Sequence, residues 1–363
     1  MLKTDFKNEQ KQKRILFYIR GMHHCHLVYN IAKNNPKYQF YFTSNYLKKD
    51  DYIRSVLYPL DNCFFVEDIK NLYAKLPLFG LFITTDCQMT AAHWYSLNIS
   101  RLFTKLNVKT VELEHGLFQL GLDYFDLPSG VNFYNDSLPT SIVADVFLSY
   151  GKEPRIPQAV CIGYPPYEKT RLNSYTGNYT LILSNLHWET YTDVEKYRFY
   201  ETIIRLVSEH PERLFVWRQH PGEKNSASCK RIYSQIFSII APRHQNLIIE
   251  NKMFDNIITE ELIAKAKNII STVSTTLLDC EIEKKDTYVY ACETNASLIE
   301  KLSKSKTFSS YEELSSIFDK KAAVVTGKLN PYNNKAFQEM VEKNYHQPEL
   351  DKAVYLDDIV QYK

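Results

Sequence analysis

Two segments of the chain place polar side chains directly after apolar runs that predict buried strands. In residues 269–279, such a run turns into a helical pattern through a series of hydroxyl residues. Hydroxyl groups together with the free N–H groups at a helix start suit a phosphate. The hydroxyl residues of this run are Ser271, Thr272, Ser274, Thr275 and Thr276.

The second segment, residues 214–223, brings Arg218 and His220 to the end of a strand, which Pro221 and Gly222 then break. Open α/β sheets bind ligands just outside the carboxyl ends of their strands. Taken alone, a hydroxyl cluster is more often an N-cap, and a His-Pro pair is more often an ordinary strand end. As two neighbouring strands, the segments predict a site for a phosphorylated ligand.

A third run in the N-terminal half ends in Glu114, His115 and Gly116. Gly116 permits a turn that other residues resist. Either neighbour could be a general base, with Glu114 tuned by His115 or His115 oriented by Glu114. Adjacent strand residues point to opposite faces, so we expect only one of the two to enter the site, unless the turn at Gly116 swings His115 round. The alternative is an ion pair of Glu114 that merely closes the strand end.

A histidine-rich stretch, residues 20–26, follows the first predicted strand. Adjacent residues such as His23 and His24 rarely reach one metal, and no partner pair follows at a usual spacing. We therefore expect a loop in which His23, His24 or His26 contacts a substrate anion or sugar hydroxyls, or else surface histidines without a role.

Common cofactor and metal motifs are missing from the sequence, including Asp-x-Asp, GxGxxG, Walker A, HExxH and GxSxG. We therefore expect no metal and no cofactor. The charge of a leaving phosphate would then be met by Arg218, His220, hydroxyl groups and helix N–H groups.

Short β-type runs alternate with amphipathic stretches such as 194–209 and 260–267, which predicts parallel α/β sheets. Eleven strands are too many for one compact sheet, so we expect two. The predicted strands are 14–19, 39–43, 81–85, 109–113, 146–149, 159–162, 179–184, 214–218, 247–250, 268–271 and 287–290.

The natural break is the Pro165-Pro166 pair and the polar stretch after it, which is typical of a linker. We expect a Rossmann-like domain on the acceptor side over 1–165 and a nucleotide-binding one over 175–335. The helical tail 336–363 would pack back on the first domain by analogy with other two-domain folds.

Length, net charge and cysteine content further narrow the class of protein. A chain of 363 residues suffices for two domains, and a net charge of +2 gives no field that favours nucleic acid. Seven scattered cysteines indicate reduced thiols. Neither an apolar leader nor a spanning apolar run is visible. We expect a cytoplasmic protein, with peripheral association at the inner face of the membrane left open.

The His-Pro and Ser/Thr segments together resemble the C-terminal halves of bacterial GT-B transferases that use cytidine-nucleotide donors. These are the polysialyltransferases, the capsule Kdo transferases and the teichoic acid glycerophosphotransferases. In those families the two motifs hold the donor phosphate. The resemblance assigns this role to His220 and to a hydroxyl set, which consists of Ser271, Ser274, Thr275 and Thr276.

The N-terminal half adds to this resemblance. Glu114-His115-Gly116 is similar to the acidic-acidic-Gly triplet of polysialyltransferases and the Glu-x-Gly of Kdo transferases. Gly130-Val131-Asn132 and residues 136–139 also match the Kdo transferase pattern, while His115-Gly116 matches the His-Gly of teichoic acid polymerases. The chain departs from the pattern at His115, which replaces an acid, and at residues 117–119, which lack the capsule-type arginine.

The resemblance implies a GT-B fold, with two Rossmann-like domains whose parallel sheets face each other across a cleft. It implies a metal-independent glycosyltransferase that moves a sugar of the Kdo or sialic acid type from CMP to a capsule or lipopolysaccharide glycan, free or lipid-linked. Three alternatives stay open: a phosphotransferase using CDP-glycerol or CDP-ribitol, a nucleotide-sugar 2-epimerase of the same fold, and a non-catalytic carbohydrate-binding relative.

The implied catalytic residues are Glu114, His115 and His220. Glu114 is favoured as the base, because the polysialyltransferase and Kdo transferase patterns share an acid at this place. The implied nucleotide and phosphate contacts are Arg218, His220, Pro221, Ser271, Ser274, Thr275 and Thr276, and the implied substrate contacts are His23, His24, Gly116 and Asn132.

Overall fold

The computed structural model describes most of the chain as two compact units. Unit 1 is formed by described residues within 1–115, 123–169 and 330–363, and unit 2 by those within 170–329. The described residues are 12–19, 22–43, 55–66, 76–87, 93–115, 125–126, 131–132, 142–152, 156–165, 177–186, 191–220, 222–223, 226–240, 244–249, 259–300, 302, 305–327 and 329–348. Among these residues, no helix is both long and apolar enough to cross a membrane.

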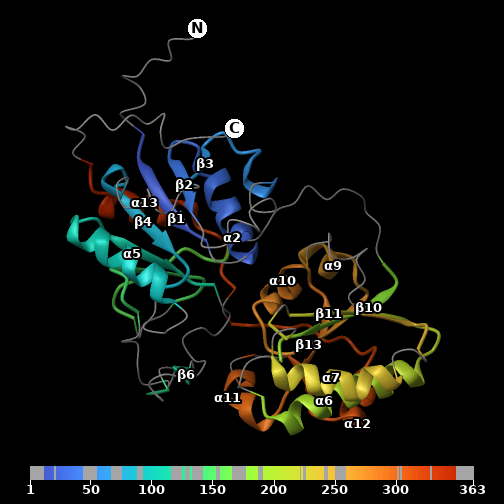
Figure 1. Cartoon of the computed structure of the whole chain (residues 1–363). Coiled ribbons are helices and arrows are strands. Elements are labelled where there is room, and N and C mark those ends of the chain that lie inside the picture. The colour runs from blue at the N-terminus through green and yellow to red at the C-terminus, as the bar shows by residue number, and fades with distance from the viewer. Residues whose placement is uncertain are drawn as a thin grey trace. The chain divides into compact units, whose positions relative to one another are not determined.

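Unit 1 contains a parallel sheet of seven strands in the order β3-β2-β1-β4-β5-β8-β9 (Figure 1). The strands are β1 Arg14–Tyr18, β2 Gln39–Thr43, β3 Cys63–Phe65, β4 Leu81–Thr84, β5 Thr110–Leu113, β8 Val146–Ser149 and β9 Ala159–Cys161. A separate two-stranded ribbon pairs β6 Phe125–Asp126 with β7 Val131–Asn132. The helices are α2 Met22–Lys33, the 3-10 turn η2 Leu76–Leu78, α5 Trp94–Lys105 and α13 Asn334–Asn344.

Unit 2 contains a parallel sheet of six strands in the order β12-β11-β10-β13-β14-β15. The strands are β10 Tyr179–Ser184, β11 Leu214–Gln219, β12 Leu247–Ile249, β13 Asn268–Ser271, β14 Asp286–Tyr290 and β15 Lys306–Phe308. The helical segments are α6 Asp193–Glu209, α7 Ala227–Ile240, α9 Thr259–Lys265, α10 Thr276–Ile282, η6 Glu293–Asn295, α11 Ala296–Ile299 and α12 Tyr311–Ile317.

All eleven predicted strands are present, and they divide between two sheets as expected. The prediction of parallel α/β architecture is therefore confirmed. The strands that the sequence did not reveal are short: β3 and β15 have three residues each, and β6 and β7 have two.

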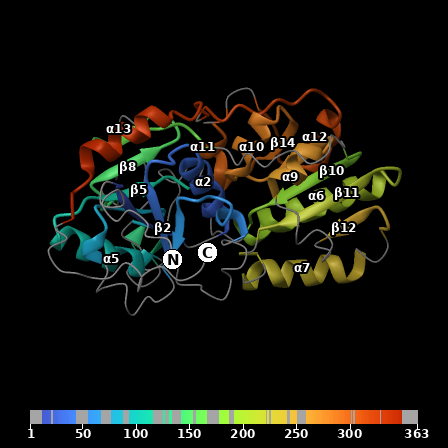
Figure 2. The same cartoon turned by 90° about the horizontal axis from the view of Figure 1, so that it is seen from above.

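Helices cover both faces of each sheet, as parallel strands buried on both faces require. In unit 2, α6, α7 and α12 lie on one face and α9 and α10 on the other (Figure 1). In unit 1, α5 and α13 lie on opposite sides of the sheet (Figure 2). Ile99 and Phe103 of α5 pack in a core cluster with Leu16 and Phe82 of the sheet.

Helix α6 begins at a capping box, in which Thr192 and Glu195 each accept the other's backbone N–H. Its buried residues recur at helical spacing, and Phe199 and Ile203 join the core cluster that includes Trp217. The main helix of unit 2 is thus set by a local start signal and one apolar face.

The chain returns to unit 1 after residue 329. Gly163 has φ of +73°, and an added Cβ there would collide with the backbone of Pro331, so glycine permits this approach. In α13, Asn334 accepts a hydrogen bond from Asn35 at 2.6 Å, and Glu342 accepts one from Tyr38 at 2.9 Å. Helix α13 therefore packs on unit 1.

Each sheet has a switch point, which is the position where the strand order reverses. On one side of it successive strands are added toward one edge of the sheet, and on the other side toward the opposite edge. In unit 1 it lies between β1 and β4, and in unit 2 between β10 and β13. Ligands of open α/β sheets bind beyond the carboxyl ends of the strands at such points. A ligand site is therefore expected at these two places.

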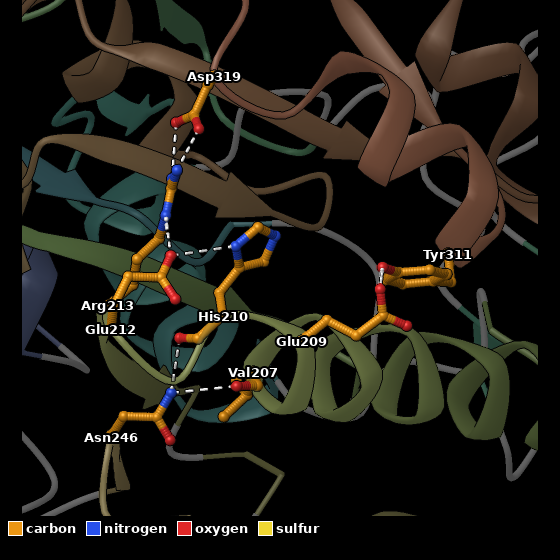
Figure 3. A network of polar contacts seen from close by, with 8 residues as sticks. All are labelled: Val207, Glu209, His210, Glu212, Arg213, Asn246, Tyr311 and Asp319. Carbon is orange, nitrogen blue, oxygen red and sulfur yellow. Dashed lines mark hydrogen bonds and ion pairs between the residues drawn. The ribbon is translucent and has the colours of Figure 1, made fainter.

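The amino-terminal edge of the sheet of unit 2 is held by a charged network (Figure 3). Arg213, just before β11, donates to Asp319 at 2.7 Å and to Glu212 at 3.3 Å. Asn246 donates to the carbonyl oxygens of Val207 and His210, both at 3.0 Å. These contacts join loops across the bottom of the sheet, and we interpret them as structural.

Candidate functional site

In unit 2 the two predicted phosphate-binding segments lie at the carboxyl edge of one sheet, but they are not neighbours. Strand β10 pairs with β11 on one side and with β13 on the other. The prediction that β11 and β13 are adjacent is therefore wrong. Because paired strands are about 4.8 Å apart, the two strand ends are separated by roughly 10 Å. The end of β10 lies between them at the switch point.

His220 follows β11 and is held in one orientation. Its Nδ1 accepts a hydrogen bond from the backbone N–H of Gly222 at 3.0 Å, and its own backbone N–H donates to Ser184 at 2.9 Å. Burial lowers the pKa of His220 from 6.5 to about 4. At neutral pH the ring is therefore uncharged. With Nδ1 as acceptor, its hydrogen lies on Nε2, which becomes a hydrogen-bond donor.

The turn that carries His220 is fixed by the buried carboxylate of Glu223. One carboxylate oxygen accepts the backbone N–H of Leu186 at 2.9 Å. The other accepts the hydroxyls of Ser184 and Tyr200, both at 3.1 Å. Burial raises the pKa of Glu223 and that of Tyr200. Sequence reasoning gave Glu223 no role.

Arg218 precedes this turn on β11. It is half-buried and alternates with the buried Trp217 and Gln219, so it faces the other side of the sheet. The indole of Trp217 donates to Ser184 at 2.9 Å. Pro221 lies outside the described residues.

The predicted hydroxyl set divides into a buried part and a half-buried part. Ser271 is fully buried, and its hydroxyl donates to the carbonyl of Thr272 at 2.7 Å. Thr272 in turn accepts the backbone N–H of Asn185 at 2.9 Å. The Ser271 hydroxyl therefore makes a hydrogen bond within the fold, and its predicted contact with a phosphate stays a prediction.

The half-buried hydroxyl residues are Ser274, Thr275 and Thr276, at the start of α10. Thr275 is the N-cap, but its side chain makes no capping hydrogen bond. The hydroxyl of Ser274 lies 3.5 Å from the backbone nitrogen of Thr276, at the limit of a hydrogen bond. Ordinary capping therefore does not account for these hydroxyls.

In unit 1, Glu114 and His115 follow β5, and the structure separates their environments. Glu114 is fully buried, and its carboxylate accepts the backbone N–H of Tyr150 at 2.7 Å. It ties the end of β5 to the end of β8. The expectation that Glu114 is the residue exposed to substrate is not met, because its side chain turns into the fold. The side chain of His115 keeps 13% of its surface exposed.

His115 belongs to a group that we call the histidine–aspartate cluster, which consists of His24, Asp86, His93 and His115. Nε2 of His115 lies 4.0 Å from Oδ1 of Asp86, and Nε2 of His93 lies 3.5 Å from the same oxygen. The rings of His24 and His115 meet edge to face with centroids 4.9 Å apart. His24 follows β1 and Asp86 follows β4, so the cluster lies at the switch point of unit 1.

Hydrogen bonds to neighbouring hydroxyl groups orient this cluster. Thr85 Oγ1 lies 2.8 Å from Nδ1 of His24 and donates toward Asp86 at 3.5 Å. The backbone N–H of Asp86 donates to Thr84 at 3.0 Å, and the hydroxyl of Ser96 donates to the carbonyl of Asp86. Ligand atoms of His24, Asp86 and His115 all lie within 4.8 Å of one another.

The predicted loop at residues 20–26 is wrong in part, because α2 begins at Met22. Within this helix His24 joins the cluster, and His26 is buried. The side chains of His23 and Asn132 and all of Gly116 lie outside the described residues.

Asp86, His93 and Thr85 were missed by sequence reasoning. Asp86 could have been found from its position directly after a buried strand, the same signal that identified His220 and Glu114. His93 begins a helix and carries no such signal.

Comparisons with known proteins bear on the fold. Neither family models nor curated proteins match the sequence. Among solved structures, the UDP-GlcNAc 2-epimerase of Neisseria meningitidis bound to UDP-GlcNAc is similar over 91% of this chain and 99% of its own, with 11% identity and a TM-score of 0.58.

Two further structures are similar to the same extent. MnaA of S. aureus with UDP covers 92% of this chain and 96% of its own, with 11% identity and a TM-score of 0.58. The UDP-GlcNAc 2-epimerase of Methanocaldococcus jannaschii with UDP-GlcNAc and UDP covers 91% and 99%, with 10% identity and a TM-score of 0.58. At such low identity the likeness establishes the fold alone, a GT-B-type fold of two parallel α/β units.

Proposed function

We propose that the chain is a metal-independent GT-B transferase that uses a cytidine-nucleotide donor. The favoured donor is a CMP-linked sugar, and the acceptor is a bacterial surface glycan. The observation that carries the proposal is His220, a neutral imidazole held with its Nε2–H as a donor at a strand end. The half-buried hydroxyls of Ser274 and Thr275 lie at the same sheet edge. We assign this edge to the donor phosphate.

A neutral donor suits this task. The Nε2–H of His220 would donate a hydrogen bond to a phosphate oxygen as negative charge develops on the leaving nucleotide. No proton has to be transferred, because the phosphate leaves as an anion. Glu223 holds the turn and so keeps this donor in place before the substrate arrives.

We assign the general base to His115, with Asp86 as its partner, and revise the preference for Glu114. In the proposed step an acceptor hydroxyl attacks the anomeric carbon and loses its proton to His115. The bond from that carbon to the donor phosphate oxygen breaks, and the nucleotide leaves with the electron pair. Asp86 would stabilise the imidazolium that forms.

Two alternatives keep specific support. A His-Gly at this place resembles teichoic acid polymerases, so His115 as the base favours a CDP-glycerol or CDP-ribitol phosphotransferase. The structural likeness to UDP-GlcNAc 2-epimerases favours an epimerase, which would need no acceptor. A cytoplasmic location stays part of the proposal and is favoured by seven free cysteines.

Nucleotide binding tests the proposal first. CMP or CDP at a hundred times its dissociation constant should stabilise the protein by about 2.7 kcal/mol in a thermal-shift screen. His220→Ala should abolish this shift, whereas Asp319→Asn, at the opposite sheet edge, should keep it. UDP alone stabilising the wild type would favour the epimerase, which incubation with UDP-GlcNAc and no acceptor would then reveal by NMR. A lack of response to every nucleotide would refute the proposal.

The neutral state of His220 has a consequence for acid stability. The unfolded chain takes up a proton near pH 6.5, but the folded protein does so only near pH 4. The contribution of His220 is therefore complete above pH 6.5 and is lost as pH falls toward 4. From pH 7.5 to 5, the free energy of unfolding of the wild type should fall by about 2 kcal/mol more than that of His220→Gln. Equal losses in chemical denaturation would show that the pKa of His220 is not lowered in the folded protein.

The hydroxyl residues of α10 can be tested for phosphate binding against helix capping. Ser274→Ala and Thr275→Ala should weaken nucleotide affinity and leave stability nearly unchanged. If either residue is only a cap, stability should fall by roughly 1 kcal/mol and nucleotide binding should stay intact. Calorimetric titration and thermal denaturation of the same variants decide between these outcomes.

Substitution of the two neighbours after β5 tests the choice of base. His115→Ala should reduce transfer at least about a hundredfold and leave nucleotide binding intact. Glu114→Gln should stay active, because its amide oxygen can still accept the N–H of Tyr150. Glu114→Ala should cost stability instead, about 1–3 kcal/mol for the donor left unsatisfied. An active His115→Ala beside an inactive Glu114→Gln would return the base to Glu114.

A further inference from the structure

We infer that the histidine–aspartate cluster of unit 1 binds a divalent transition-metal ion of the zinc class through His24, Asp86 and His115. These residues come from α2 and from the ends of β4 and β5, and their ligand atoms lie within 4.8 Å of one another. Two imidazoles and one carboxylate form a set that zinc accepts while keeping a fourth position open.

The surroundings of His24 fit a metal ligand. The Thr85 hydroxyl lies 2.8 Å from Nδ1 of His24, and this contact orients the ring. In the tautomer with its hydrogen on Nδ1, the lone pair of Nε2 would bind the metal. Ligand histidines are regularly oriented by a hydrogen bond to their other ring nitrogen.

Asp86 is fixed in a similar way and is also buried. Thr84 and Ser96 hold its backbone N–H and carbonyl, and its side chain is 2% exposed. A buried carboxylate is costly unless a positive charge or hydrogen-bond donors compensate it. A cation between Asp86 and the imidazoles would supply that charge, while His93 can donate to the same carboxylate from outside.

Only a small movement is required to close the site. Zinc–nitrogen bonds of about 2.0–2.1 Å place tetrahedral ligand atoms roughly 3.3 Å apart. Oδ1 of Asp86 and Nε2 of His115 are 4.0 Å apart. His115 is the most exposed of the three residues, and a shift of its ring by about 1 Å would bring this pair to the tetrahedral spacing.

The consequence for activity rests on the proposed function. A metal on His115 would occupy the lone pair that the base needs. Zinc should therefore inhibit transfer, and removal of zinc by EDTA should restore it. The cluster would then be a metal-sensitive acid–base site whose catalysis itself needs no metal.

Binding is measured without reference to activity. The full chain, freed of metal with EDTA, is titrated with zinc chloride in a calorimeter. We expect one equivalent of tight binding that weakens at least a hundredfold in Asp86→Asn and His115→Ala. Thr85→Val, which removes only the hydroxyl beside His24, should weaken it ten- to a hundredfold. The control is His244→Ala, an outer histidine of unit 2 that lies 3.1 Å from Ser208 and should bind zinc normally.

Thermal denaturation of each variant separates lost ligands from lost folding. His115→Ala is the decisive variant, because His115 is the most exposed of the three ligand residues and its removal should disturb the core least. A wild type that binds no zinc, or variants that bind as well as the wild type, would overturn the inference and leave the proposed transferase unaffected. Tight zinc binding in a chain that binds no nucleotide would support the metal site and refute the proposed function instead.

Discussion

The buried carboxylate of Glu223 is the contact on which the candidate donor site depends. It accepts three hydrogen bonds, from the end of β10, from α6 and from the backbone beyond β10. Its own N–H donates to the carbonyl of His220 at 2.9 Å. Each of these donors would cost about 1–3 kcal/mol if it were left buried without a partner. The turn after β11 therefore has one favoured conformation. This conformation determines the orientation of His220.

In unit 1, hydrogen bonds also hold polar side chains at the ends of strands. The backbone of Asp86 donates to Thr84, and the Thr85 hydroxyl orients His24, so hydrogen bonds hold two members of the histidine–aspartate cluster. His115 is the more exposed member, with 13% of its side chain accessible. A buried carboxylate beside a partly exposed imidazole suits a proton acceptor, and the same pair suits a metal ion. Both roles follow from placing polar residues at the switch point of a parallel sheet.

Much of this fold could be predicted because strands buried on both faces are continuous apolar runs in the sequence. All eleven predicted strands exist, including the three-residue strands β9 and β12, whereas β3 and β15, which are as short, were missed. The order of strands within a sheet depends on long-range packing. For that reason β10 was not expected between β11 and β13.

The candidate site could be predicted only in part. The pleat of a strand implied that Glu114 and His115 differ in direction, but it could not say which of them the core would cover. Asp86 and His24 are 62 residues apart in the chain, so no local spacing could join them. Glu223 looked like an ordinary loop residue, because its importance lies in the buried donors around it.

The most direct test of this account is a crystal structure of the full chain with a bound cytidine nucleotide. The account predicts the phosphate at the carboxyl edge of the sheet of unit 2, within hydrogen-bond distance of Nε2 of His220 and of the hydroxyls of Ser274 or Thr275. A nucleotide bound elsewhere, or a His220 that donates to protein atoms while phosphate is present, would contradict it.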